Sequence, residues 1–517
     1  MLDAPAAVGL IEDGQTVAVG GSGHLLQAPD ALLAALASRH AQTGVPTGLT
    51  VVHTMGIGDN AAKGIGRLTG PDLVKRVVGS HYGHNPGLME MIRQGEIEAF
   101  GIPGGVLSLL YREIAGGRPG LLTAVGLGTY VDPRVDGGRL NDAARGSIAE
   151  VIELRDREWL FYPSFPIHVG LIRATTADTA GNLTMEDEAG LADNLALASA
   201  VHNSGGKVIA EVKRIAKAGT LPPKDVRVPG ILVDAIVVEP HQEQTAATQY
   251  SPYLAGTLRA PDASLAPLAT GPRKIVARRA AMEVEPGDIV NLGYGMATGV
   301  AAVLAEEGFH DDVVFSIEQG IIGGVPSTGL DSGTATNAHA MIDEGAQFDL
   351  YDGGILDTCC VSFGEVDVSG NVNVSKLAGR PVGPGGFINI TQNARKVIFC
   401  GTMTGGGLEV QAREGHLEIV REGRYPKFVA TVDQITFSAR DVLGAGKSIM
   451  YVTERAVFRM TADGLELIEI APGVDLERDV LGQMGFRPLV SSRLSPMSDQ
   501  LYATGRMGLH RFTRTEG

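Results

Sequence analysis

The sequence is poor in cysteine, in tryptophan and in long hydrophobic runs. Among 517 residues there are three cysteines and one tryptophan. Three cysteines are too few for the disulfide framework of a small secreted protein. No eighteen consecutive residues lack charged or strongly polar interruptions, which excludes an ordinary membrane-spanning helix. The first residues, "MLDAPAAVGLIEDGQ", show neither a basic segment followed by an apolar core nor an arginine-rich amphipathic pattern. We therefore expect no targeting peptide and a cytoplasmic location.

Positive charge is also scarce, because 43 lysines and arginines face 59 aspartates and glutamates and leave a net charge of −16. Binding to nucleic-acid phosphates needs a basic field, so we expect no nucleic-acid partner and no membrane partner. The cysteines lie in apolar runs, Cys359 beside Cys360 and Cys400 at the end of "KVIFC". Such positions are typical of small core residues, and we predict neither a metal site nor a catalytic thiol.

Glycine, in contrast, is abundant, with 70 residues, and the glycine turns reveal an internal repeat. Three short stretches recur in the same order in the two halves of the chain. The pairs are "GQTVAVGGSG" at 14–23 with "GDIVNLGYG" at 287–295, "DTAGNL" at 178–183 with "DVSGNV" at 367–372, and "KVI" at 207–209 with "KVI" at 396–398. The last two pairs share one offset, 367 − 178 = 189. We infer a duplication.

Within each half, short apolar runs alternate with helical patterns. Residues 49–55, 207–212 and 312–317 are suited to buried strands, whereas 28–41 has the pattern of a helix. This alternation predicts an α/β fold of two homologous domains, each with a parallel-rich sheet covered by helices. The predicted domains are residues 1–260 and 273–517, joined by a linker at 261–272 in a stretch rich in proline and alanine.

The stretch "VVFSIEQGIIGGVP" at 313–326 places Glu318 directly after a strand and before several glycines. Ligands of parallel sheets bind at the carboxyl ends of strands. A glutamate with its reference pKa of about 4.3 is a carboxylate at neutral pH and can act as a nucleophile without a base. Backbone N–H groups exposed by glycines can stabilise an oxyanion by roughly 3 kcal/mol per donor. The alternative is a solvated loop residue or a helix cap.

Five segments resemble the class I coenzyme A transferases, and among them the single-chain propionate and acetate:3-oxoacid CoA-transferases. They are "FSIEQGIIGGVP", "FDLYDGGILD", "VDVSGNVNVSKLAGRPVGPGGFINITQNARKVIFCGTMTGGGLEV", "IEAFGIPGGVLSLLYREIAGGRPG" and "VGLGTYVDPR". The likeness runs from about residue 10 to 490. It implies that Glu318 attacks an acyl-CoA to give a mixed anhydride and then a glutamyl-CoA thioester, from which a short-chain carboxylic acid takes CoA. It also implies CoA as a substrate, no tightly bound cofactor or metal, and a homodimer or homotetramer.

The resemblance implies further site residues. The oxyanion and substrate set is Asn371, Gly104, Gly105, Gly20, Gly21 and Gly23, and the CoA-binding set is Gly405, Gly406, Gly407, Gln319 and Gly320. Where Gly104 stands, the family commonly has a glutamine, so we predict a pocket enlarged for a longer or branched acyl group. A purely structural role is the alternative for Asn371, because Asn182 takes the equivalent place in the first repeat.

Three other functions compete. An acyl-CoA hydrolase would use the same glutamyl thioester with water, and a CoA-dependent lyase or ring hydrolase would use the carboxylate as a base. A ligand sensor is disfavoured by the intact Ser-Ile-Glu-Gln-Gly turn at 316–320 and by the absence of an appended helix-turn-helix. The sequence does not choose the acyl group or the acceptor acid.

Overall fold

The computed structural model describes residues 1–261, 263–413 and 415–509, and the chain divides into two units. The first is Met1–Pro261 with Ile317–Leu350 and Ala378–Asn389, and the second is Asp262–Ser316 with Tyr351–Leu377 and Ile390–Gly517. The sequence predicted a single boundary at 261–272, so this division differs from the prediction. The internal repeat could not reveal that residues 317–350 and 378–389 belong to the first unit. The repeated stretches are strands and turns, and these two segments lie between them.

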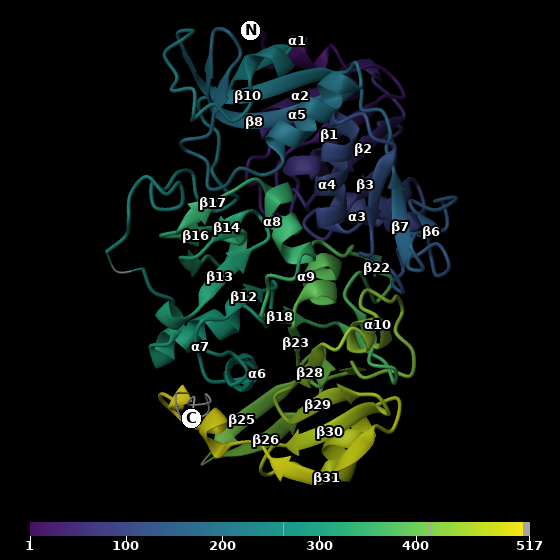
Figure 1. The fold of residues 1–517 in the computed structure, drawn as a ribbon, viewed down its shortest axis with the longest axis vertical. Helices are drawn as coiled ribbons and strands as arrows, with labels where there is room; N and C mark the ends of the chain where they lie inside the picture. The colour runs from purple at the N-terminus through teal and green to yellow at the C-terminus, as the bar shows by residue number, and fades with distance from the viewer. Residues whose placement is uncertain (262, 414, 510–517) are drawn as a thin grey trace. The chain divides into compact units, whose positions relative to one another are not determined.

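The first unit is built on a sheet in the order β11-β10-β8-β1-β2-β3-β4, in which all neighbours are parallel (Figure 1). Its strands are β1 (Thr16–Val19), β2 (Leu49–His53), β3 (Val74–Gly79), β4 (Glu98–Gly101), β8 (Val169–Asp178), β10 (Lys207–Ala216) and β11 (Ala235–Val238). The first-unit helices are α1 (Ala4–Val8), α2 (Asp30–Thr43), α3 (Pro86–Gln94), α4 (Gly104–Ala115) and α5 (Asn194–Asn203). Every residue of β8 is buried, as expected for a strand covered on both faces.

The second unit contains the parallel strands β13-β12-β18-β23-β28, continued by β29, β30 and β31. The last three run side by side at the yellow end of the chain in Figure 1. The strands are β12 (Ile289–Leu292), β13 (Val314–Ile317), β18 (Thr358–Ser362), β23 (Lys396–Cys400), β28 (Ser448–Val452), β29 (Ala456–Thr461), β30 (Gly464–Ile470) and β31 (Leu489–Pro496). The helices are α6 (Pro272–Ala281), α7 (Gly299–Glu307) and α10 (Ala439–Gly444).

The two sheets repeat one topology, which confirms the predicted duplication and the α/β fold class. The order β11-β10-β8-β1-β2 in the first unit corresponds to β28-β23-β18-β12-β13 in the second. The glycine turns after β1 and β12 are also equivalent: the Gly20 N–H donates to the Leu171 carbonyl at 2.8 Å, and the Gly293 N–H donates to the Cys360 carbonyl at 2.8 Å.

The remaining elements are short and lie in connecting segments. Helices α8 (Glu344–Asp352) and α9 (Phe387–Asn393) follow the loops that border Glu318 and Gly386. The short strands are β5 (Gly120–Thr123), β6 (Glu150–Glu153), β7 (Glu158–Pro163), β9 (Leu183–Thr184), β14 (Ile321–Ile322), β15 (Val325–Pro326), β16 (Ala335–Thr336), β17 (Ala340–Met341), β19 (Glu365–Val366), β20 (Val372–Asn373), β21 (Lys376–Leu377), β22 (Arg380–Pro381), β24 (Thr404–Gly405), β25 (Glu409–Arg413), β26 (His416–Arg421) and β27 (Tyr425–Pro426).

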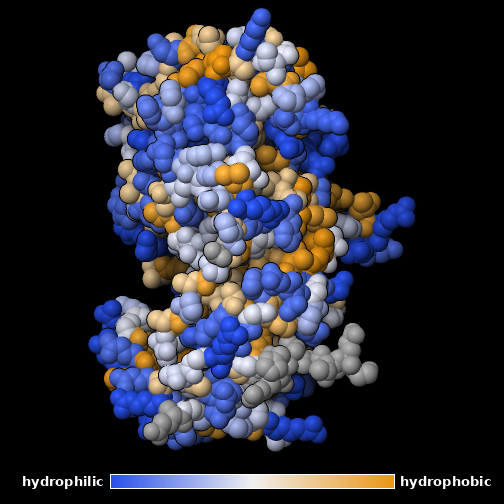
Figure 2. Space-filling view, turned by 90° about the vertical axis from the view of Figure 1, so that its left-hand side faces the viewer, coloured by the Kyte–Doolittle hydropathy of each residue, from blue (hydrophilic) through white to orange (hydrophobic). Residues whose placement is uncertain are grey.

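The helix lengths test the prediction that the chain has no membrane-spanning helix. Among the described residues, the longest helix, α2, has 14 residues, and no helix is long and apolar enough to cross a bilayer. The face in Figure 2 mixes hydrophilic and hydrophobic side chains. All three cysteines are unpaired and buried, as predicted for core residues.

Candidate active site

Glu318 directly follows β13, in the first unit, at the carboxyl end of the strand. Its side chain is partly buried. The Gln319 amide donates to Glu318 Oε1 at 3.3 Å and also to the Ser22 hydroxyl at 3.3 Å. Ser22 is fully buried in the turn after β1. The nucleophile predicted from the sequence is therefore linked by Gln319 to the first glycine turn.

A second backbone segment approaches the Glu318 carboxylate. The backbone N–H of Gly386 donates a hydrogen bond to it. A Cβ atom at position 386 would overlap Glu318 Oε2, so only glycine allows this approach. The sequence prediction missed Gly386, although it lies in a glycine-rich turn, "GPGGF" at 383–387.

The first turn of α4 packs on the same segment. The Gly104 N–H donates to the Gly385 carbonyl at 2.9 Å, and the Gly105 N–H donates to Asn389 Oδ1 at 3.2 Å. A Cβ atom at position 104 would lie 2.8 Å from Met55 Sδ. The Met55 side chain thus lies where a side chain at position 104 would begin, and the enlargement of the pocket stays a prediction.

The predicted glycines at 20–23 and at 320 have the conformations of tight turns. Gly21 and Gly23 have φ of 114° and 51°, and Gly320 has φ of 85°, values that other residues adopt only with strain. The turn at 20–23 closes with a hydrogen bond from the Ser22 N–H to the Leu26 carbonyl at 2.8 Å. These glycines shape the backbone that presents Ser22 and Gln319.

Burial changes the acidity of Glu318. It raises the pKa of Glu318 from its ordinary value of 4.5 to about 7, and the hydrogen bonds from Gln319 and the Gly386 N–H oppose this rise only in part. From the sequence, we expected Glu318 to be a carboxylate with the ordinary pKa of a glutamate. In the structure, burial favours the protonated form of Glu318 and makes its carboxylate form more basic. A carboxyl pKa raised by desolvation in a glycine-lined site is typical of a catalytic group.

Comparisons with known proteins show the family of this chain. A family profile described as Coenzyme A transferase matches residues 2–239. Acetate CoA-transferase YdiF of Escherichia coli K12 is 42% identical over 509 residues, which cover 98% of this chain and 96% of that protein. The chain belongs to the coenzyme A transferase family.

Two further comparisons extend the likeness over the whole chain. Caffeate CoA-transferase of Acetobacterium woodii is 42% identical over 516 residues, which cover 98% of each protein. The crystal structure of the acyl-CoA transferase YdiF from Escherichia coli O157:H7, in a thioester complex with CoA, superposes with a TM-score of 0.93 at 41% identity and covers 98% of this chain and 96% of that one. The protein is a CoA-transferase, and CoA is its substrate.

A second buried carboxyl group of this CoA-transferase interacts with Glu318. Glu344, the first residue of α8, is fully buried, and neither of its oxygens has a hydrogen-bond partner among the described residues. Burial, with smaller effects of Asp193 and Glu318, raises its pKa well above the ordinary value. Burial thus favours the protonated, neutral form of Glu344. No sequence pattern indicated Glu344, because its environment depends on burial alone.

Asn371, predicted at the oxyanion site, lies in the second unit. Its Nδ2 donates to Asp367 Oδ2 at 3.2 Å, and its Oδ1 accepts the Ala439 N–H at 3.2 Å. In the first unit, Asn182 Nδ2 donates to Asp178 Oδ2 at 3.0 Å, and its Oδ1 accepts a backbone N–H at 2.9 Å. Both amides close equivalent turns, which favours the structural alternative. A catalytic role for Asn371 stays a prediction.

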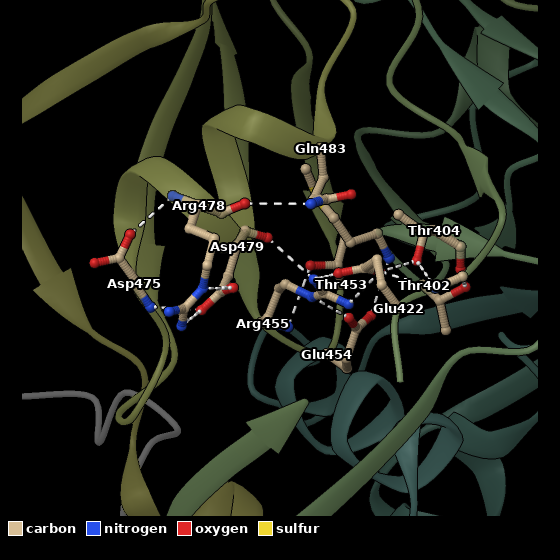
Figure 3. A network of polar contacts seen from close by, with 12 residues as sticks. Thr402, Thr404, Glu422, Thr453, Glu454, Arg455, Asp475, Arg478, Asp479 and Gln483 are labelled. Atoms are coloured by element: carbon tan, nitrogen blue, oxygen red, sulfur yellow. Dashed lines mark hydrogen bonds and ion pairs between the residues drawn. The ribbon is translucent and has the colours of Figure 1, made fainter. Parts of the chain in front are cut away.

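The glycine turn at 405–407 also belongs to the second unit, where β24 pairs with β27. A buried network holds the residues before it (Figure 3). The fully buried Arg455 binds Glu454 at 2.6 Å and Glu422 at 2.7 Å. Glu454 accepts the Met403 N–H at 3.0 Å, and Glu422 accepts the Thr404 hydroxyl. The start of the turn is thus fixed by ion-paired carboxylates.

The described residues contain no group of three or more histidines, cysteines, aspartates or glutamates arranged to hold a metal ion. The groups around Glu318 are a glycine backbone N–H, an amide, a hydroxyl and a carboxyl. Their chemistry suits nucleophilic and hydrogen-bonding roles.

Proposed function

We propose that the enzyme transfers CoA from an acyl-CoA to a short-chain carboxylic acid through a covalent glutamyl-CoA thioester on Glu318. The observation that carries this proposal is the partly buried Glu318 carboxyl with the backbone N–H of Gly386 against it. The related YdiF structure is described as a thioester complex with CoA, which supports a covalent route for a relative.

The reaction begins with attack of a Glu318 carboxylate oxygen on the thioester carbonyl carbon. The C–S bond breaks, the CoA thiolate leaves with the electron pair, and a mixed anhydride remains. The thiolate then attacks the glutamyl carbonyl carbon and expels the acyl group as its carboxylate, which leaves glutamyl-CoA. An incoming carboxylate reverses both steps and departs as the new acyl-CoA.

The site supplies two physical advantages for these steps. The raised pKa of Glu318, about 7, makes its carboxylate more basic and therefore a stronger nucleophile than an ordinary glutamate. The Gly386 N–H and the Gln319 amide can stabilise the negative charge that develops on the glutamyl oxygen when the thiolate attacks. Because a carboxylate displaces a thiolate uphill, binding of the remote part of CoA must drive anhydride formation.

The finer assignments form part of the same proposal. Gly20, Gly21, Gly23, Gly104 and Gly105 shape the acyl and oxyanion region. Gln319, Gly320 and the glycine turn at 405–407 contact CoA. We also propose a cytoplasmic homodimer or homotetramer.

Borohydride reduction tests the covalent step. The protein is incubated with acetyl-CoA and then with borohydride, which reduces an activated glutamyl ester to an alcohol. We expect a loss of mass confined to the peptide that carries Glu318, and no change in a Glu318→Gln variant. Transfer by the Glu318→Gln variant at the wild-type rate would refute the proposal.

A panel of carboxylic acids separates transfer from hydrolysis. With acetyl-CoA and an acceptor acid, a transferase produces a new thioester, whereas a hydrolase only accumulates free thiol. The same panel identifies the preferred acid.

A further inference from the structure

The fully buried Glu344 takes no part in the steps described above. It is the first residue of α8, and its backbone N–H donates to the Ala192 carbonyl at 3.1 Å. In the part of the chain that the structure describes, neither oxygen of its side chain has a hydrogen-bond partner. A buried carboxyl group without a partner or counter-charge is far more stable protonated than ionised.

The backbone holds Glu344 close to the turn that carries Glu318. The Ile342 N–H donates to the Gly320 carbonyl at 2.8 Å, so a residue two positions before Glu344 is bonded to one two positions after Glu318. A Cβ atom at Gly320 would overlap the Ile342 carbonyl oxygen. The two segments therefore pass each other in direct contact.

Helix α8 also packs on the backbone that approaches the Glu318 carboxylate. Phe348 lies one turn after Glu344 and on the same face of the helix. A Cβ atom at Gly386 would lie 3.3 Å from Phe348 Cζ, and a Cβ atom at Gly105 would overlap the same ring. Packing of α8, rather than any bond of its own side chain, thus fixes the position of Glu344.

The acidic groups around Glu344 oppose its ionisation. Asp193, at the start of α5, and Glu318 both repel a negative charge on Glu344. The Asp193 carboxyl already accepts the Ser108 hydroxyl. Asp343, the residue before Glu344, is exposed.

Helix α4 brings no counter-charge to Glu344. Tyr111 faces it, and burial with smaller effects of neighbouring acids raises the pKa of that phenol. Arg112 pairs instead with Asp349 on the outer face of α8. Among the described residues no cation pairs with Glu344, so its ionised form would have only repulsive neighbours.

We propose that Glu344 is a positioning residue for the acceptor acid: its protonated form lets the carboxylate approach Glu318, and its ionisation at alkaline pH slows this step. In the glutamyl-CoA intermediate, Glu318 is an ester without charge, and the incoming acid is an anion. A protonated Glu344 adds no charge there, whereas an ionised Glu344 repels the anion. The assignment rests on the covalent route of the proposed function.

The two half-reactions should respond to pH differently. In a reaction of this kind, kcat/KM for the acyl-CoA reports the unmodified enzyme, and kcat/KM for the acid reports the intermediate. Esterification removes the charge of Glu318, which is one of the groups that oppose ionisation of Glu344. Glu344 should therefore ionise at a lower pH in the intermediate, and the acid should lose rate at a lower pH than the acyl-CoA.

Profiles of kcat/KM against pH test this role. We would use acetyl-CoA and propionate from about pH 6 to 10, a range over which propionate stays ionised, with the wild type, Glu344→Gln and Glu344→Asp. In the wild type, kcat/KM for propionate should fall about tenfold or more at the alkaline end. The fall should be absent from Glu344→Gln and kept in Glu344→Asp. Asp349→Asn removes a charge from the same helix at a side chain that is 52% exposed, and it should leave the fall unchanged.

An alkaline fall that is missing from the wild type, or that persists in Glu344→Gln, would overturn the proposal. So would a fall at one common pH for both substrates of the wild type, a comparison that needs no variant and holds even if Glu344→Gln does not fold. Failure of borohydride labelling at Glu318 would contradict the covalent route itself. Intact labelling with an unchanged fall in Glu344→Gln would contradict the role of Glu344 alone.

Discussion

Replacing Glu318 with glutamine should remove activity and, at alkaline pH, stabilise the protein. The amide keeps the size of the side chain and its carbonyl oxygen can still accept the Gly386 N–H, but it does not ionise. Burial raises the pKa of Glu318 from 4.5 to about 7. A carboxyl with a raised pKa holds its proton more tightly in the folded protein than in the unfolded chain. Its favourable contribution is therefore complete below pH 4.5 and is lost as the pH rises through about 7.

The size of the effect follows from the two pKa values. A difference of about 2.5 between them, at 1.36 kcal/mol for each pKa unit, corresponds to about 3 kcal/mol. This is an upper value, because Glu318 keeps some exposure to solvent. The free energy of unfolding of Glu318→Gln, minus that of the wild type, should increase by this amount between pH 4.5 and 8.

Urea titrations at pH 5, 6, 7 and 8 measure this difference. The buried carboxyl groups Asp193, Glu211 and Asp367, which also have a raised pKa, titrate in both proteins and cancel. Glu344 loses the repulsion of Glu318 in the variant, so its smaller change adds to the difference. Glu96→Gln, at an exposed position, is the matched control and should give a difference independent of pH. A pH-independent difference for Glu318→Gln as well would refute the reasoning that burial controls this carboxyl group.

Three further substitutions test the geometry of the site. Gly386→Ala should lower the rate of CoA transfer at least about 100-fold, because the new methyl group overlaps the nucleophilic carboxylate; near-normal turnover would contradict the close approach. Gly104→Gln should lower the free energy of unfolding by about 1–3 kcal/mol through overlap with Met55, and adding Met55→Ala should restore stability; chemical denaturation checks both. Asn371→Ala and Asn182→Ala should lower the thermal midpoint to a similar extent, because each amide closes the same kind of turn; a loss of kcat in Asn371→Ala alone would indicate an oxyanion role.

The strand positions could be predicted from the sequence because their signals are local. The run before Glu318 is apolar, and the turns after β1 and β12 contain glycine at matching places. These local patterns predicted the duplication, the α/β class and the place of Glu318 at a strand end. They specify which residues form a strand and which residue follows it.

The environment of the nucleophile could not be predicted in the same way. Gly386 lies 386 − 318 = 68 residues after Glu318, and Ser22 is almost 300 residues before it. Their contacts depend on how distant segments pack, and no local pattern records that packing. The space beside Gly104 illustrates the same limit, because the sequence shows the missing side chain but not that Met55 fills its place.

Strand register shows which residue of the first repeat stands where the second repeat has Glu318. Val17 on β1 pairs with Val51, and its counterpart Val290 on β12 pairs with Phe315. Counting three residues onward along each partner strand places Thr54 where the second repeat has Glu318. Thr54 is buried and hydrogen-bonds with Asp193.

A glutamate at position 54 would put a second carboxyl group against Asp193, whose pKa burial already raises to about 6. Two buried carboxyl groups in contact could not both ionise without a large cost in free energy. The first repeat therefore keeps a neutral hydroxyl at its strand end and supplies supporting groups instead, namely the Ser22 hydroxyl and the first turn of α4. The two repeats therefore differ at equivalent strand ends. The second repeat has the carboxyl group of Glu318, and the first repeat has Thr54, which does not ionise.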